Sequence, residues 1–477
     1  MSADLRRLAL GVLLPGFAGT ALPASIEALL RDGLAGVALF GPNVVDVAQV
    51  RALTDAVRTA SPSAVVAIDE EGGDVTRLHV PDGSPEPGNG VLGRLDDVDG
   101  TAASAHRIGL ELAAAGVRLD LAPTVDVNTN PDNPVIGARS FGEDPSLVAR
   151  HAAAWVRGLQ SAGVAACAKH FPGHGDTAVD SHLGLPVVDR DLDALTATDL
   201  PPFVAAVEAG VAAVMTSHIL LPALDPDAPA TMSRRILTGL LREELGFDGV
   251  VVSDALDMAG ASGTIGVPAA AVRALVAGAD LLCLGKHSEH HVEPAAAAIE
   301  AAVEEGALPL ARLEDAVARV RALRVPAAAD GPRPLPARLA AAFDVRPGAV
   351  LPRPGEAWTV VRLDVEANIA VGETGWGPFA AASDTGRFAS WPRIDVDADE
   401  AGAAPEVAGP VLVVGRDVHR HPHVRAVVDA LRDRGGSVLV VDMGWPSPDR
   451  RYADVATFGS SRAVGAALLG LLTGEED

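Results

Sequence analysis

Aromatic residues are scarce in this sequence of 477 residues: they make up only 3% of it, and there is a single tyrosine. Any hydrophobic core must therefore consist mainly of alanine, valine and leucine. Such a core is feasible, because 48% of the residues are hydrophobic. The chain is longer than one ordinary core accommodates, so we expect two domains.

Cysteine is rarer still. Only Cys167 and Cys283 are present, and both lie in apolar runs that are typical of buried strands. We therefore expect two buried thiols rather than the disulfide framework of a small secreted protein.

The sequence also lacks a long apolar run. No stretch of about 18 uninterrupted apolar residues occurs, so we expect no membrane-spanning helix and no membrane partner. Arg6 and Arg7 precede an apolar stretch, as in a signal peptide, but Asp4 comes before them and Pro15 interrupts the stretch. These features favour a first barrel strand at Leu8–Leu14 over an export signal, and hence a cytoplasmic protein.

Positive charge is in short supply. Lysine and arginine total 38 against 63 acidic residues, which gives a formal net charge of −25. A surface of this charge repels phosphate backbones, so nucleic acid is not an expected partner. The acidic residues are dispersed along the chain, and solubility accounts for them.

Eight short apolar runs alternate with stretches that carry apolar residues at helical spacing. The runs are Leu8–Leu14, Gly36–Phe40, Val65–Ile68, Val117–Ala122, Ala165–Lys169, Ala213–Thr216, Gly249–Val252 and Asp280–Leu284. Strands that alternate with helices predict an α/β protein with a parallel sheet, and eight repeats fit a closed (β/α)8 TIM-like barrel. An open, doubly wound sheet is the alternative, but such sheets rarely reach eight units.

The composition changes after the barrel pattern. We assign residues 1–325 to the barrel, 326–357 to a linker rich in proline, alanine and glycine, and 358–477 to a small C-terminal α/β domain. The last of these contains strand-like Val411–Val414 and Val438–Val441. It carries no motif of reacting groups, so we expect no catalytic contribution from it.

Polar segments follow five of the predicted barrel strands. They are Asp69–Gly73, Asp126 with Arg139–Gly142, Lys169–Thr177 with Asp180–His182, Thr216–His218, and Ser253–Met258. Reacting groups of such barrels gather at the carboxyl ends of the strands. Carboxylates there accept hydroxyl hydrogens and cationic side chains donate to oxygens, which suits a polyhydroxylated ligand. A carboxylate at a strand end can also attack the anomeric carbon of a sugar.

Four of these segments resemble family 3 of the glycoside hydrolases, and more narrowly its β-N-acetylglucosaminidase (β-N-acetylhexosaminidase) branch. They are Ala67–Gly73, Ile136–Gly142, Lys169–Gly175 together with Asp180–His182, and Val252–Met258. The resemblance covers about residues 8–325 in the family's order, and the loop with Asp-Ser-His is its most telling feature.

The resemblance implies a retaining exo-acting hydrolase that needs no metal or other cofactor. Asp254 would be the nucleophile that forms a covalent glycosyl-enzyme, and His182, polarised by Asp180, would be the acid/base. A histidine can serve both steps because its unperturbed pKa is about 6.5. The residues that would bind the hydroxyls of the non-reducing sugar are Asp69, Arg77, Arg139, Lys169 and His170.

The implied partner is a small carbohydrate with a terminal N-acetylglucosamine. Recycling of cell-wall muropeptides and breakdown of chitooligosaccharides both fit, and the sequence defines neither this choice nor the oligomeric state. Gly173 and Gly175 suggest that the loop with His182 is mobile. Glu70 replaces the family's usual glutamine, and Asp74 stands where arginine is common, which leaves the fine substrate preference open.

Several alternatives remain at this stage. A β-N-acetylglucosaminide phosphorylase or a β-glucosidase of the same family also fits the segments. The phosphorylase is possible because a histidine repels an incoming phosphate less than a carboxylate does. A zinc-dependent hydrolase could use His170, His174, His182 and His218. Asp254 could merely cap a helix, and a noncatalytic sugar-binding barrel would need neither a nucleophile nor an acid/base.

Overall fold

The computed structural model describes residues 2–181, 183–323, 327–329, 338–353, 356–365, 370–385, 388–397 and 404–474. The chain divides by its contacts into two compact units. The first comprises Met1–Glu70, Val98–Val127 and Glu143–Pro334, and the second comprises Glu71–Asp97, Asn128–Gly142 and Leu335–Asp477. Two segments from the N-terminal part of the chain thus pack with its C-terminal part.

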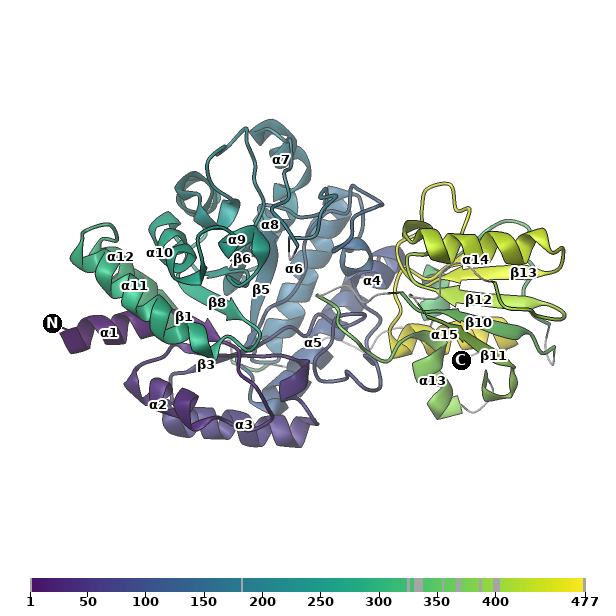
Figure 1. Ribbon diagram of the computed structural model, residues 1–477, viewed down its shortest axis with the longest axis horizontal. Helices are drawn as coiled ribbons and strands as arrows, with labels where there is room; N and C mark the ends of the chain where they lie inside the picture. Colours follow the sequence, from purple (N-terminus) through teal and green to yellow (C-terminus); the bar gives the residue numbers. More distant parts are fainter. Residues whose placement is uncertain are drawn as a thin grey trace. The chain divides into compact units, whose positions relative to one another are not determined.

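The first unit is a parallel β-barrel of eight strands in the order β1-β8-β7-β6-β5-β4-β3-β2 (Figure 1). The strands are β1 (Leu13–Pro15), β2 (Gly36–Leu39), β3 (Val65–Ile68), β4 (Leu119–Asp120), β5 (Ala165–Phe171), β6 (Ala213–Thr216), β7 (Val250–Ser253) and β8 (Leu281–Gly285). The end strands β1 and β2 are in contact, and just before them Ala35 N donates to Leu10 O at 3.0 Å. The predicted α/β barrel is confirmed.

Helices connect the strands and lie outside them (Figure 1). They are α2 (Ala24–Asp32), α3 (Val47–Ala60), α5 (Val98–Ala115), α6 (Pro145–Ser161), α7 (Leu192–Thr198), α8 (Leu200–Glu208), the π-type helix η4 (Arg235–Glu244), α9 (Ala259–Ser262), α10 (Val267–Ala277), α11 (Val292–Glu304) and α12 (Leu310–Arg321). Aspartates at their N-caps start several of them; Asp46, for example, accepts from Gln49 N at 2.7 Å. Within the described ranges, no helix has the length and apolar character that crossing a membrane requires.

The first predicted strand was wrong over most of its length. Residues Ser2–Leu10 form helix α1, and β1 begins only at Leu13. Asp4 lies in the first turn of α1 and Arg7 in the last, which suits the helix dipole. The apolar run at Leu8–Leu14 therefore crosses from a helix into a strand, and a short run of this kind does not distinguish the two.

The barrel interior explains why certain residues reach the rim. Alternate residues of each strand face the same side, and one buried cluster holds Val65 and Ala67 of β3 together with Val250 and Val252 of β7. Continued by two residues, the same alternation leads from β3 to Asp69 and from β7 to Asp254. Both carboxylates therefore belong to the inward-facing rows.

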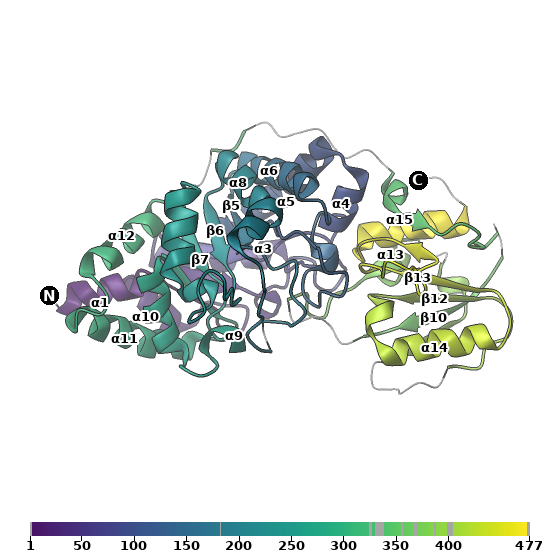
Figure 2. The same cartoon turned by 90° about the horizontal axis from the view of Figure 1, so that it is seen from above.

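The second unit contains a six-stranded sheet in the order β11-β10-β12-β13-β14-β9. Its strands are β9 (Asp344–Val345), β10 (Thr359–Leu363), β11 (Arg393–Val396), β12 (Val411–Gly415), β13 (Val438–Asp442) and β14 (Val455–Ala456); only β9 pairs antiparallel. Helices α13 (Gly377–Thr385) and α15 (Arg462–Thr473) cover one face, and α14 (Pro422–Asp433) covers the other (Figure 2). The predicted C-terminal α/β fold is confirmed.

The faces of this sheet are covered by two separate clusters of buried apolar residues. Leu412 and Leu439 lie in one cluster with Leu468 of α15, whereas Val413 and Val440 lie in the other with residues of α14. Helix α4 (Asn89–Leu95), which follows β3 in the chain, contributes Val91 to the α15 cluster.

Candidate active site

Two of the predicted sugar ligands form an ion pair at the carboxyl ends of β3 and β5. Lys169 Nζ donates to Asp69 Oδ1 at 2.7 Å, and the two side chains are 3% and 19% exposed. The pair lies directly beyond the apolar interior of the barrel. It presents a cation and a carboxylate to an incoming hydroxyl-rich ligand, which such groups bind in pairs.

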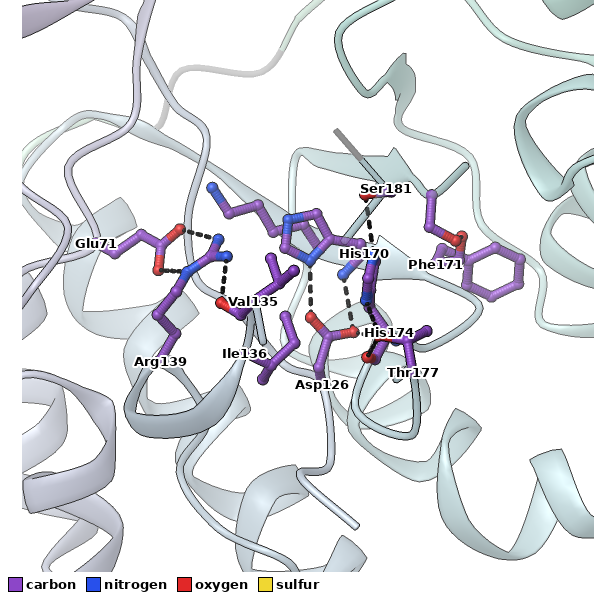
Figure 3. Close-up of polar contacts among 12 residues, drawn as sticks. Glu71, Asp126, Val135, Ile136, Arg139, His170, Phe171, His174, Thr177 and Ser181 are labelled. Atoms are coloured by element: carbon purple, nitrogen blue, oxygen red, sulfur yellow. Dashed lines mark hydrogen bonds and ion pairs between the residues drawn. The ribbon is translucent and has the colours of Figure 1, made fainter. Parts of the chain in front are cut away.

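His170 is held by a buried carboxylate, Asp126, that follows β4. Asp126 Oδ2 accepts from His170 Nδ1 at 2.7 Å, and Asp126 Oδ1 accepts from His174 N at 2.7 Å (Figure 3). Burial alone would raise the pKa of Asp126, but His170 and His174 outweigh burial and the pKa is lowered. Asp126 is therefore an anion that fixes the orientation of the His170 ring. The sequence placed Asp126 at the rim without assigning it a role.

The loop after β5 is fastened from within by His174. Its Nδ1 lies 2.8 Å from Thr177 Oγ1, and its Nε2 lies 3.1 Å from Ser181 Oγ (Figure 3). Burial lowers the pKa of His174 to about 4, so the ring is neutral at physiological pH. His174 thus stabilises the loop that contains Asp180 and Ser181. His182, the predicted acid/base, lies outside the described residues.

The same loop is also fastened to its neighbours. Gly260 N, in α9, donates to Ser181 O at 3.2 Å. Farther along, Val188 N donates to Leu220 O at 3.0 Å, and Leu220 N donates to Pro186 O at 2.9 Å. The first bond brings Ser181 beside the segment that follows Asp254 in the chain, and the other two join the loop to the segment after β6.

Gly173, at the start of this loop, is packed closely against Asp199. Its φ is +140°, and a Cβ atom there would lie 2.7 Å from Asp199 Cβ. Glycine is therefore required by the close approach of Asp199. Asp199 itself is buried and pairs with Arg190 at 2.5 Å, and Arg190 also binds Asp176 at 3.0 Å. A second set of contacts thus secures the loop.

Asp254 is half-buried at the end of β7, and its Oδ1 accepts from Ala255 N at 2.7 Å. His218 supports this segment, because its Nε2 donates to Ala255 O at 3.0 Å and its Nδ1 lies 2.9 Å from Thr231 Oγ1. His218 is therefore a buried histidine with partners on both nitrogens. The first α-helix after Asp254, α9, begins at Ala259 and has Met258 at its N-cap, so Asp254 does not cap it.

Two predicted ligands belong to the second unit. Arg139 donates to Glu71 through two bonds, of 2.7 and 3.1 Å, and to Val135 O at 3.1 Å (Figure 3). The Arg139 and Glu71 side chains are 5% and 2% exposed. Arg77 donates to the backbone oxygens of Ala370 at 2.7 Å and Val371 at 3.1 Å. Glu71 therefore fixes the guanidinium of Arg139, a role that sequence reasoning missed.

Asp74, which departs from the family's pattern, is a buried acceptor within the second unit. Its Oδ1 accepts from Ser460 N at 2.7 Å and from Ser460 Oγ at 2.9 Å. Burial raises its pKa, although these hydrogen bonds oppose the change. Asp74 thus ties the segment after β3 to the residues that precede α15.

Three of the four histidines proposed for a zinc site, His170, His174 and His218, have protein partners, and the fourth, His182, lies outside the described residues. Among the residues that the structure describes, no group of three or more His, Cys, Asp or Glu side chains could hold a metal ion. His170, His174 and His218 instead contact Asp126, Ser181 and Thr231. Hydrogen bonding explains all three.

Known proteins are similar to this chain in both sequence and fold. Residues 20–323 match the family model described as "Glycosyl hydrolase family 3 N terminal domain". "Beta-hexosaminidase A" of Pseudoalteromonas piscicida is 39% identical over 333 residues, which cover 64% of this chain and 56% of that protein. The matched part of the chain thus spans little more than half the length of this relative.

Two solved structures extend the comparison. A family 3 β-N-acetylglucosaminidase from Paenibacillus sp. str. FPU-7 covers 99% of this chain, with 97% of its own length matched, a TM-score of 0.85 and 31% identity. NagZ from Neisseria gonorrhoeae, in complex with N-trifluoroacetyl-D-glucosamine, covers 66% of this chain and 98% of its own, with a TM-score of 0.55 and 31% identity. The first therefore resembles both units and the second a part of the chain.

Proposed function

The chain belongs to glycosyl hydrolase family 3, and we propose that it is a retaining exo-β-N-acetylhexosaminidase that removes terminal β-linked N-acetylglucosamine. One observation carries the proposal: Gly260 N donates to Ser181 O at 3.2 Å. This bond joins the loop proposed to hold the acid/base to the segment proposed to hold the nucleophile. Sugar binding alone would not require this loop to be joined to the segment after Asp254.

In the first step, the carboxylate of Asp254 attacks the anomeric carbon and forms a covalent ester with the sugar. His182 donates its proton to the glycosidic oxygen as the bond to the leaving group breaks. Asp180 stabilises the imidazolium before transfer and orients the ring, as carboxylates do beside catalytic histidines.

In the second step, the neutral His182 takes a proton from water while the water oxygen attacks the anomeric carbon. The ester to Asp254 breaks, and the sugar leaves with the configuration it had in the substrate, because two displacements have occurred. No metal or other cofactor takes part in either step.

The bound sugar is held by the charged residues at the strand ends. We propose that Asp69 and Lys169 bind its hydroxyls as a pair and that His170, oriented by Asp126, binds a further hydroxyl. Arg139, which Glu71 fixes, and Arg77 belong to the second unit and stay predicted sugar ligands. The related proteins support an N-acetylated sugar as the ligand, since they include a β-hexosaminidase, a β-N-acetylglucosaminidase and a complex with N-trifluoroacetyl-D-glucosamine.

The physiological setting is a further part of the proposal: cytoplasmic turnover of muropeptides during peptidoglycan recycling, or of chitooligosaccharides. Both present a terminal β-linked N-acetylglucosamine, and they differ only on the leaving-group side. The ratio of kcat/KM for N-acetylglucosaminyl-anhydromuramic acid to that for N,N′-diacetylchitobiose separates them.

The first test compares release of 4-nitrophenol from its N-acetyl-β-glucosaminide and its β-glucoside, with and without inorganic phosphate. The parent is expected to prefer the N-acetylated sugar and to ignore phosphate. Asp254→Ala should lower kcat by on the order of 10⁴-fold, because the covalent step is lost. Asp248→Ala, an exposed aspartate before the same strand, is the matched control and should be fully active.

Each contrary result has a definite meaning. Acceleration by phosphate with glycosyl phosphate as the product would make the protein a phosphorylase. Preference for the glucoside would make it a β-glucosidase. Undiminished activity of Asp254→Ala would eliminate Asp254 as the nucleophile.

A further inference from the structure

At Gly260, three segments that are distant from one another in the sequence lie in contact. Gly260 lies in α9, six residues after Asp254 in the chain, and its N–H donates to Ser181 O. A Cβ atom at this position would lie 3.0 Å from Ser181 O, 3.1 Å from Gly184 O and 3.1 Å from His218 Cβ. These distances are too short for a Cβ atom unless the neighbours move by a few tenths of an ångström.

The segments that converge here are otherwise well fixed. Leu183 N and Gly184 N both donate to Asp180 O, at 3.0 and 3.2 Å, so Asp180 and Gly184 are the ends of one tight turn. Ser181 is tied to His174 on the inner side of this turn. His218 is tied to Ala255 O, next to Asp254. An added methyl group at residue 260 therefore pushes the turn of the loop away from the segment after β7.

We propose that Gly260 is a positioning residue for proton donation, because the absence of a side chain there sets the distance between the Asp180–Gly184 turn and the Asp254 segment. The inference rests on the proposed function, in which this turn carries the acid/base. Two of the three atoms that the added Cβ would meet, Ser181 O and Gly184 O, belong to this turn, whereas the third belongs to His218, which is held at both ring nitrogens. The turn therefore yields more readily than the Asp254 segment, and the pair Asp69–Lys169 is not among the atoms contacted.

The effect should depend on the leaving group. A 2,4-dinitrophenolate departs without protonation, whereas the sugar alkoxide of N,N′-diacetylchitobiose departs only with a proton from the acid. Since kcat/KM reports the first, glycosylating step, Gly260→Ala should lower kcat/KM for the disaccharide by about tenfold, as expected for a small misplacement of a catalytic group. For the 2,4-dinitrophenyl N-acetyl-β-glucosaminide the same variant should stay within about twofold of the parent.

Gly239→Ala is the matched control. Gly239 lies within the helix η4, and a Cβ atom there would meet nothing within 4 Å. It therefore tests the same change of residue in a helical backbone without the contact to the loop, and should leave both substrates unaffected. Ser181→Ala is a second probe, because it removes the bond to His174 on the opposite side of the same turn, and it should reproduce the selective loss.

The outcomes separate the inference from the function on which it rests. Equal losses on both substrates, or no loss on either, in Gly260→Ala and Ser181→Ala with parental thermal unfolding midpoints, would overturn the positioning role. A parent that cleaves neither substrate would instead overturn the proposed function. A selective loss in both variants, with Gly239→Ala unchanged, would support the inference.

Discussion

Replacing Asp126 by asparagine tests whether a buried carboxylate orients the sugar ligand His170. Asp126 is 1% exposed, and it accepts from His170 Nδ1, His170 N and His174 N. An asparagine can keep the acceptor for the backbone amides, but its NH2 group would face the Nδ1–H of His170. The ring must then turn or change tautomer, and its Nε2 is no longer presented to the sugar in the same way.

The magnitude follows from the bond that is lost. A hydrogen bond to a charged group contributes about 1.5–3 kcal/mol. If that bond serves to present His170 to the sugar, kcat/KM for 4-nitrophenyl N-acetyl-β-glucosaminide should fall by about 10- to 150-fold. The free energy of unfolding in urea should fall by a similar amount at pH 7, because the folded state loses the same interaction.

The pH dependence gives an internal check. The pKa of Asp126 is lowered in the folded protein, so its contribution to stability is present above the ordinary aspartate pKa of about 3.9 and is lost as the pH falls through the folded value. The stability difference between the parent and Asp126→Asn should therefore be largest at neutral pH and shrink below about pH 4.

The control variant is Asp144→Asn. Asp144→Asn makes the same change at the exposed N-cap of α6, where asparagine also caps well, and should leave activity and stability nearly unchanged. Parental kcat/KM in Asp126→Asn, or a stability difference that is constant from pH 7 to pH 3, would show that the charge of Asp126 does not hold His170.

Two further predictions concern other buried ion pairs. Lys169→Met should raise the KM for the same glycoside by at least about tenfold, because it removes the cation that pairs with Asp69 and leaves that carboxylate uncompensated. An unchanged KM would contradict a role of Lys169 in sugar binding. Asp280→Ala should lower the free energy of unfolding in urea by about 3–5 kcal/mol, because Arg242 and Arg312 lose their common partner. The kcat/KM per folded molecule should be unchanged. A loss of stability below about 1 kcal/mol would show that this cluster is not needed for stability.

Sequence reasoning predicted the barrel because its strands are continuous apolar runs that end in polar residues. Six of the eight runs overlap an observed strand closely; Val117–Ala122 contains the two-residue strand β4, and Leu8–Leu14 joined the end of α1 to the start of β1. The small second sheet was less visible. Strands β9 and β14 are two residues long, and such strands are defined by the partners they meet rather than by their own sequence.

The candidate site shows the same division. Asp69 and Lys169 were predicted as ligands from segments that the sequence displays directly, and the structure brings the two together. The roles of Asp126, Glu71 and Gly260 were not evident, because each depends on a contact with a loop distant in the chain. The domain boundaries at residues 325 and 357 and the catalytic roles of Asp254, Asp180 and His182 stay predictions.

The second unit cannot assemble until the C-terminal part of the chain has been synthesised. Glu71–Asp97 and Asn128–Gly142 emerge from the ribosome early, yet they pack with residues after Leu335. Val91 must wait for Leu468, nearly four hundred residues later, before it is covered. The nascent chain therefore holds exposed apolar surface until translation is nearly complete, and a homologous C-terminal domain could be exchanged only together with both early segments.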